Sequence, residues 1–151
     1  MKTTILISKA KKLFLMMVAG VMIVSFSSCA TKTRFLNSSV VPGADGTVSV
    51  KQDDNKNYNI SVSVRNLAEP SRLQPAKNMY VIWMEGDDNE TKNIGQIKTS
   101  NSIISKQMKS SFETVSAVKP KKIFITAEND PSIQYPNTSD IVLTTDYLRN
   151  R

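Results

Sequence analysis

The chain has no histidine and only one cysteine among its 151 residues. Histidine is the usual general base near neutral pH and the commonest metal ligand in proteins. Its absence excludes Ser-His-Asp and Cys-His catalytic sets and leaves carboxylates alone for zinc, which prefers nitrogen and sulfur ligands. A single cysteine also excludes a disulfide within these residues. We therefore expect neither a catalytic role nor a cofactor.

The one cysteine, Cys29, stands where an export signal is expected to end. Lysines precede an apolar run at residues 13–26, and Ser27 and Ser28 lie directly before Cys29. A basic start, a short apolar run and small residues before the cut define a secretion signal. The cysteine after the small pair resembles a bacterial lipobox. That resemblance implies cleavage between Ser28 and Cys29, and attachment of a diacylglycerol and an N-acyl lipid to Cys29.

Two other interpretations of Cys29 stay open. In the first, Cys29 is a free thiol or forms a disulfide with another molecule. In the second, ordinary signal cleavage near Cys29 releases a soluble protein. The run at 13–26 is shorter than the about 18–20 apolar residues that a spanning helix needs. A lipid-anchored chain with Ala30, and not aspartate, after the cysteine is expected at the outer membrane facing the periplasm. The cell surface and the inner membrane are the alternative locations.

Four segments follow from this interpretation. Residues 1–28 are a lipoprotein signal, 29–36 a short tether, 37–146 one domain and 147–151 a flexible tail. The formal charge is +7, but four of the 20 basic side chains lie in the signal, which leaves 16 against 13 acidic ones. So mild an excess argues against nucleic-acid binding, which needs a clustered basic face.

The domain has the pattern of an all-β protein. Apolar residues alternate with polar ones at 48–50 and 60–64, and the turn-forming residues 53–57 lie between them, which predicts a hairpin. Residues 79–84 are apolar throughout, as in a central strand covered on both faces. Further strands are expected at 122–127 and 140–145. A weaker strand is expected at 93–99, in which Gly95 marks a bulge or a close approach of another segment. The segment at 103–115 is ambiguous and is expected to form either a strand or a short helix.

About seven to nine short strands with frequent turn signals favour an antiparallel, immunoglobulin-like β-sandwich. The order of motifs supports this through a resemblance. Residues 73–84 contain a Leu-Pro stretch, a tyrosine and an aliphatic-Trp-aliphatic strand, and 93–95, 125–128 and 141–143 follow with a Gly turn, a Thr-x-Glu strand and a closing aliphatic strand. The chain resembles the extracytoplasmic domain of anti-sigma factors of the anti-sigma-K type. The resemblance implies a β-sandwich outside the cytoplasm. It does not extend to the sigma-binding segment of that family.

Ser116 and Lys119 fit the Ser-x-x-Lys pattern of penicillin-recognising enzymes, in which the lysine helps to activate the serine. That mechanism also needs Ser-Asp-Asn and Lys-Thr-Gly elements. The sequence offers only incomplete counterparts at 139–141 and 98–100. We therefore do not expect a catalytic role for Ser116 and Lys119.

Two acidic turns, at 53–55 and 87–90, are weak candidates for calcium. Calcium takes six to eight oxygen ligands, and such ligands would come from Asp53, Asp54, Asp87, Asp88 and Glu90. Neither turn has the spaced pattern of a calcium loop, and aspartate and asparagine are also the residues that plain turns prefer.

Aromatic residues are the remaining candidates for a binding site. Trp83 and Tyr80 are three residues apart in a predicted strand, so they point to opposite faces and cannot form one platform. We expect Trp83 in the core of the sandwich. We expect Tyr80, Tyr135 and Tyr147 to be the better candidates for an exposed ligand site.

Three functions remain. The first is a non-enzymatic envelope lipoprotein that binds or scaffolds another envelope component, with the membrane and an envelope protein as partners. The second, from the resemblance, is a module that senses or regulates envelope stress. The third is a small envelope hydrolase, which would require Glu85, Glu113 and Glu128 to converge on one cleft.

Overall fold

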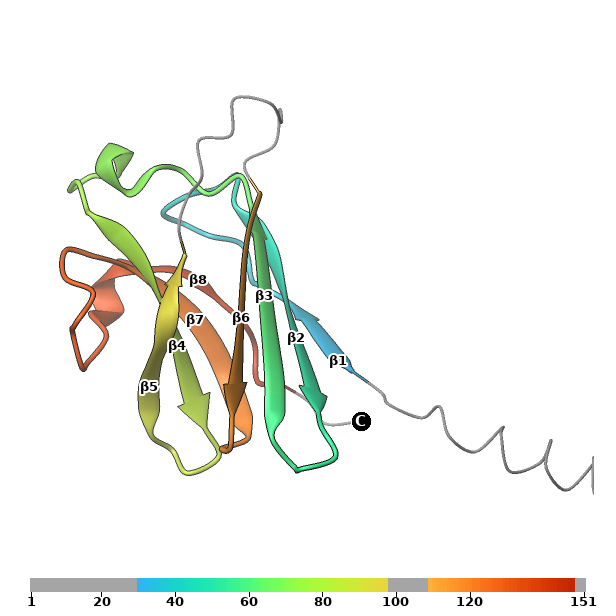
Figure 1. The fold of residues 1–151 in the computed structure, drawn as a ribbon. Coiled ribbons are helices and arrows are strands. Elements are labelled where there is room, and N and C mark those ends of the chain that lie inside the picture. The colour runs from blue at the N-terminus through green and yellow to red at the C-terminus, as the bar shows by residue number, and fades with distance from the viewer. Residues whose placement is uncertain (1–29, 98–108, 149–151) are drawn as a thin grey trace, which may run out of the picture.

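The computed structural model describes residues 30–97 and 109–148 as two antiparallel sheets packed face to face (Figure 1). The first sheet has the strand order β1-β2-β3-β6, and the second has the order β5-β4-β7-β8. The strands are β1 (Thr31–Arg34), β2 (Asp45–Gln52), β3 (Tyr58–Arg65), β4 (Met79–Gly86), β5 (Thr91–Ile97), β6 (Lys109–Ser116), β7 (Pro120–Glu128) and β8 (Ile141–Thr144). Two 3-10 helices, η2 (Pro70–Arg72) and η3 (Thr138–Asp140), lie in the connections. The predicted all-β antiparallel sandwich is confirmed, and its immunoglobulin-like connectivity stays a prediction.

The predicted hairpin is formed by β2 and β3. Val48 lies opposite Val62, and Val50 lies opposite Ile60. The Asp53 side chain closes the turn by accepting hydrogen bonds from the backbone N–H groups of Asn55 (2.9 Å) and Asn57 (2.8 Å). These are the local bonds for which turns favour aspartate, so the turn chemistry sets the register of the two strands.

The main core lies between the two sheets and follows the period of two expected for half-buried strands. Val48, Ile60, Val62 and Val64 of the first sheet are at most 1% exposed. They meet the inward-facing side chains of the second sheet, which are Tyr80, Ile82, Met84, Ile123, Ile125 and Leu143. The polar residues that alternate with these valines in β3 therefore point away from the core.

Strand β4 is covered on both faces, as its continuous apolar run predicts. Val81 and Trp83 point to the outer face of the second sheet, where they form a separate cluster with Phe124. Trp83 is fully buried there, and its ring stacks on Phe124 with centroids 6.4 Å apart. The prediction that Trp83 is a core residue is confirmed for its burial, but the residue belongs to this outer cluster and not to the space between the sheets.

The segment expected to be a tether contains β1. Thr31 lies opposite Val50 and Arg34 opposite Thr47, and Phe35 bridges to Thr145. Extended residues with backbone donors and acceptors add a strand to an available sheet edge, and here that edge is β2. Cys29 lies outside the described residues, and only Ala30 separates it from β1 in the sequence.

The other end of the domain is also joined to the sandwich. The backbone N–H of Leu148 donates to the Lys121 carbonyl at 2.9 Å, and its side chain packs on the main core. In the ambiguous segment at 103–115, residues 109–115 belong to β6. Residues 103–108 lie outside the described part of the chain.

Gly95 sits beside a β-bulge in the pairing of β4 with β5, as predicted. Ile82 lies opposite Gly95 and Trp83 opposite Asn93, so Ile94 is the extra residue. Gly95 has φ +148°, and a Cβ atom at this position would lie 2.3 Å from the Phe112 ring of β6. Glycine is thus required here by both the backbone conformation and the close approach of the first sheet.

Candidate functional site

A pocket opens at the end of the sandwich where β4 and β8 begin and β7 ends. Its volume is about 220 Å³. Val40, Leu73, Pro75 and Val142 form apolar walls, and Lys77 and Asp140 contribute the charged groups. Val40 is 44% exposed, so an apolar side chain stands at the rim. Apolar walls with a few converging polar groups are the usual composition of a binding pocket.

The connection between β3 and β4 builds one wall of this pocket. The backbone N–H of Lys77 donates to the Pro70 carbonyl at 3.0 Å, which folds the segment back on η2. The Tyr80 hydroxyl donates to the Ala68 carbonyl at 2.8 Å and holds the same segment to β4. The expectation that Tyr80 is an exposed candidate for ligand binding is therefore wrong. Its ring points into the main core, and burial raises its pKa to about 12.

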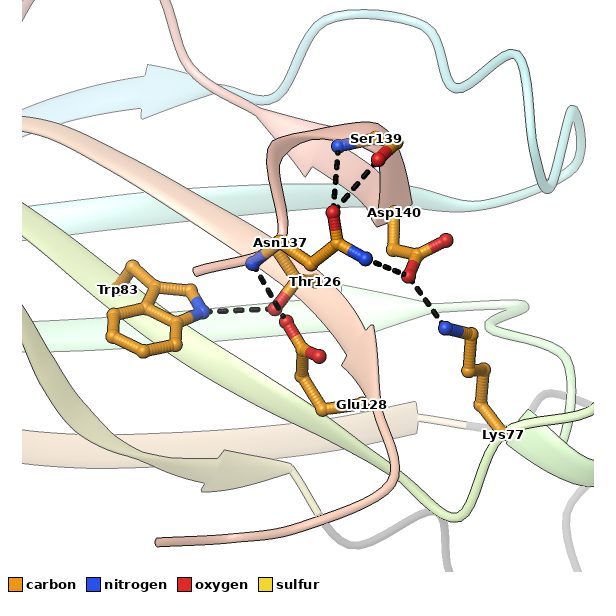
Figure 2. Close-up of polar contacts among 7 residues, drawn as sticks. All are labelled: Lys77, Trp83, Thr126, Glu128, Asn137, Ser139 and Asp140. Carbon is orange, nitrogen blue, oxygen red and sulfur yellow. Dashed lines mark hydrogen bonds and ion pairs between the residues drawn. The ribbon is translucent and has the colours of Figure 1, made fainter. Parts of the chain in front are cut away.

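An ion pair joins the two sides of the pocket. Lys77, two residues before β4, donates a hydrogen bond from its ammonium group to Asp140 at the end of η3 (Figure 2). The side chains are only 12% and 20% exposed. Removing a charge from water is costly unless an opposite charge and further hydrogen bonds replace the lost hydration.

Asn137 supplies these further bonds and connects the ion pair to β7. Its amide nitrogen donates to Asp140 at 2.7 Å, and its side-chain oxygen accepts from the Ser139 hydroxyl at 2.7 Å (Figure 2). Its backbone N–H donates to the buried Glu128 carboxylate at 3.2 Å. The segment at 129–140 is thereby held over the second sheet. This network holds the Lys77 and Asp140 charges in place and orders the loop.

A hydrogen bond from Trp83 continues the polar layer beneath this segment. Its indole nitrogen donates to the buried Thr126 hydroxyl at 2.8 Å (Figure 2). A fully buried indole N–H requires such a partner. Ile133 of the same segment packs on the Trp83 cluster. Residues 129–140 therefore both shape the pocket and cover the outer face of the second sheet.

The three glutamates proposed for a hydrolase do not converge. Glu85 lies opposite Lys122 at one end of the β4–β7 ladder, and Glu128 lies opposite Met79 at the other end. Glu113 belongs to the other sheet, where it lies opposite Ser61. A pair of catalytic carboxyl groups must lie within about 5–10 Å of one another, so these three form no shared site.

Ser116 and Lys119 belong to the β6–β7 turn. The Ser116 hydroxyl donates to the Val118 carbonyl at 2.8 Å and accepts from the Val118 N–H at 3.0 Å. The Lys119 carbonyl accepts from the Asp87 N–H at 3.0 Å. Of the other elements of that enzyme pattern, Ser139 and Asp140 lie in the pocket network, and residues 98–100 lie outside the described chain. Ser116 therefore bonds within the β6–β7 turn, and the Lys119 backbone bonds to the neighbouring β4–β5 turn.

The two acidic turns lie at the same end of the sandwich (Figure 1). The residues that line the pocket lie at the other end, where β4 begins and β7 ends. Asp88 accepts from the Glu90 N–H at 3.0 Å, and this backbone bond is the main reason that its pKa is lowered. Lys92 pairs with Asp88 at 3.2 Å and with Glu90 at 2.9 Å. Across residues 30–97 and 109–148, no three histidine, cysteine, aspartate or glutamate side chains group so as to hold a metal ion.

Two of the predicted exposed tyrosines are exposed. Tyr135 is 83% exposed within the segment at 129–140, and Tyr147 is 56% exposed near the chain end. The Lys121 and Lys122 ammonium groups lie 5.4 and 5.9 Å from the centre of the Tyr147 ring. Tyr147 therefore lies beside the start of β7, at the other end of the sandwich from the pocket.

Sequence reasoning did not find the Lys77–Asp140 pair. The two residues are 63 positions apart, and neither belongs to a motif with fixed spacing. Their neighbours Pro75 and Pro136 signal irregular connections, but they do not indicate that the two connections meet. Only the pairing of β4 with β7, and of β7 with β8, brings them together.

No protein-family model, curated protein or solved structure matches this chain. The relation to anti-sigma factors therefore stays a prediction, as does the stress-sensing role that it implies. Among the described residues, none of the helices has the length and apolar character needed to cross a bilayer. Cys29 and the signal residues lie outside the described chain, so lipid attachment also stays a prediction.

Proposed function

We infer that the chain is a lipid-anchored, non-enzymatic β-sandwich of the bacterial envelope, which binds another envelope component at the pocket beside Lys77. One observation carries this proposal. The pocket lies at one end of the sandwich, and the start of β1 lies toward the other end, beside the β2–β3 turn (Figure 1). An anchor at Cys29 would leave the pocket open and directed away from the membrane.

The size of the pocket indicates what it would accept. Pockets for drug-sized ligands have volumes of about 300–1,000 Å³, and this one has about 220 Å³. It suits one apolar side chain of a protein partner, with the exposed Val40 at the rim as a first contact. The Lys77–Asp140 pair would supply a donor and an acceptor beside that side chain, which adds orientation to the apolar contact.

The proposed anchor would hold the domain close to the bilayer, because a single residue separates Cys29 from β1. The turns at 53–57 and 86–90 would then lie nearest to the headgroups. Apart from Gly86 their side chains are polar or charged, and Asp53 and Asp88 accept hydrogen bonds from backbone N–H groups within each turn. A polar surface of this kind can lie beside the hydrated lipid headgroups without inserting into the bilayer.

The anchor is tested by metabolic labelling with a palmitate analogue in cells that express the wild-type chain or Cys29→Ala. We expect label on the wild-type protein in the membrane fraction and no label on the variant. An unlabelled wild-type protein in the soluble fraction would contradict the anchor. It would instead support ordinary cleavage near residue 29.

The pocket is tested with a photo-reactive amino acid at Val40 in the full chain, expressed in its own cells. Val115 is a matched control, because it is also a valine and is 60% exposed, but it lies in β6 and not in the β1–β2 connection that lines the pocket. We expect one defined protein crosslink from Val40 that is absent from Val115 and lost on Lys77→Met. The same products from both positions, or none from Val40, would contradict a pocket-bound partner.

A further inference from the structure

A second surface, separate from the pocket, covers the outer face of the first sheet. We call the outward-pointing side chains of β1, β2, β3 and β6 the cationic face. The strand registers place its residues in rows, such as Lys32, Ser49, Ser61 and Glu113 in one row and Arg34, Thr47, Ser63 and Ser111 in the next. These residues alternate with the buried valines of the core, so they point to the other side of the sheet.

Charge is distributed unevenly between this face and the rest of the domain. The face carries five basic side chains and two acidic ones, and the other described residues carry seven basic and eleven acidic ones. Its charged members are Lys32, Arg34, Lys51, Arg65, Lys109, Asp45 and Glu113. The net charge is therefore +3 on one sheet face and −4 elsewhere in the described chain. A local excess of one sign attracts ligands of the opposite sign.

The remaining side chains on the cationic face are short and hydroxylated. Thr47, Ser49, Ser61 and Ser63 form its centre and are half-buried by their neighbours, and Ser111 is exposed beside them. A hollow of about 200 Å³ lies along the β3–β6 seam, lined by Asn59, Ser61, Glu113 and Val115 among others. Hydroxyl and amide groups donate and accept hydrogen bonds, so the centre can bond to hydroxyl groups of a ligand.

The cationic face has few side chains of the kinds that bind nucleic-acid bases or insert into bilayers. No aromatic side chain points outward from these four strands in the described chain, and Val115 is the one large apolar residue that does. Proteins that bind single-stranded nucleic acid stack bases on aromatic rings. Surfaces that insert into bilayers present aromatic and large aliphatic residues. Neither partner fits a flat surface of hydroxyl groups bordered by lysine and arginine.

We propose that the cationic face binds an anionic polysaccharide, a polymer of sugars that bear carboxylate or phosphate groups. Neighbouring strands are about 4.8 Å apart, and outward residues repeat about every 6.7 Å along a strand. The registers place Lys32 and Arg34 along the β1 edge of the hydroxyl centre, Lys51 at one end and the Arg65–Lys109 pair at the other, while Glu113 lies on the β6 edge. A polymer with an anionic group on each sugar can pair with several of these basic groups at once. Lysine and arginine pair with the anionic groups, while serine and threonine bond to sugar hydroxyls. This surface requires neither the pocket nor the anchor.

The test measures binding of the full chain, purified in mild detergent, to polygalacturonate, with neutral dextran as the comparison polymer. We expect binding to polygalacturonate alone, weakening as salt rises. Arg34→Gln with Arg65→Gln should weaken it about tenfold, since two exposed ionic contacts are lost. Arg72→Gln with Lys92→Gln makes the same charge change off the face and should weaken it less than about twofold.

Glu113→Gln provides a change of opposite sign. It keeps an acceptor for the Ser61 hydroxyl, which donates to Glu113 at 3.5 Å, and removes a negative charge beside the hollow. Binding should strengthen about two- to threefold. Equal loss in the two double variants, or equal binding of dextran, would overturn the proposal. So would a larger effect of the face variant on vesicles rich in phosphatidylglycerol than on polygalacturonate, because the ligand would then be a membrane.

Discussion

The two outer faces of this sandwich differ in composition and in what covers them. The outer face of the second sheet is apolar at Val81, Trp83 and Phe124, and the segment at 129–140 covers it. The outer face of the first sheet is built mainly from serine, threonine, lysine and arginine, with Asp45, Glu113 and Val115 among them, and no described segment packs across it (Figure 1). Strand β4 is apolar at every position from 79 to 84, whereas β3 alternates. A continuous apolar run thus indicates a sheet face that the chain itself will cover, and alternation indicates a face left to solvent or to a partner.

The largest expected loss of stability comes from removing the buried Trp83 side chain from the outer face of the second sheet. Trp83→Ala removes a fully buried ring, its stacking on Phe124 and its bond to Thr126. We expect a loss of about 3–5 kcal/mol in the free energy of unfolding, measured by urea titration. Val115→Ala on the other sheet removes an exposed side chain and should change it by less than about 0.5 kcal/mol. Similar losses in both variants would show that the two faces do not differ as described.

The next largest loss of stability is expected from breaking the Lys77–Asp140 ion pair, which holds the segment at 129–140. Lys77→Met leaves the mostly buried Asp140 carboxylate without its ammonium partner. The expected loss is about 2–3 kcal/mol in the free energy of unfolding. Lys77→Met combined with Asp140→Leu removes both charges and should recover part of that loss, as seen by the urea midpoint. If the double variant is less stable than the single one, the pair is not what holds residue 140 in place.

A smaller effect is expected where the edges of the two sheets meet. Gly95→Ala puts a Cβ 2.3 Å from the Phe112 ring and forces alanine into a conformation with φ +148°. We expect a loss of about 1–3 kcal/mol in unfolding free energy. Adding Phe112→Leu should relieve the contact but not the backbone strain, so recovery should be partial. Gly43→Ala, where a Cβ meets no atom within 4 Å, is the control.

The smallest effect is expected at the centre of the cationic face. Ser63→Ala changes one half-buried hydroxyl among other polar groups, and Ser49→Ala does the same on the neighbouring strand. Each should alter the free energy of unfolding by less than about 0.5 kcal/mol, while the sheet stays paired. Circular dichroism and urea unfolding check this. A loss above about 2 kcal/mol would mean that this face is structural and not a surface for binding.

Particular residues show how far prediction from the sequence reached. The β2–β3 hairpin, the doubly covered β4 and the bulge at Gly95 follow from local pattern and turn chemistry. The prediction for Tyr80 was wrong, because the period of two tells which residues share a face but not which face is the main core. The tether prediction missed β1, because a short edge strand is stabilised by its partner and not by its own composition.

The sequence by itself determined the class of fold, because alternation, turn residues and apolar runs act over a few residues and need no distant partner. Within these 151 residues it also excluded a histidine-based catalytic set and an internal disulfide, and it predicts an export signal that ends directly before Cys29. Only the tertiary structure decided that Trp83 lies outside the main core, that Lys77 meets Asp140, and that five basic side chains share one sheet face. These depend on strand order and register, which bring together residues far apart in the sequence, such as Lys77 and Asp140, 63 positions apart. Strand order and register are set by the summed packing of the whole sandwich.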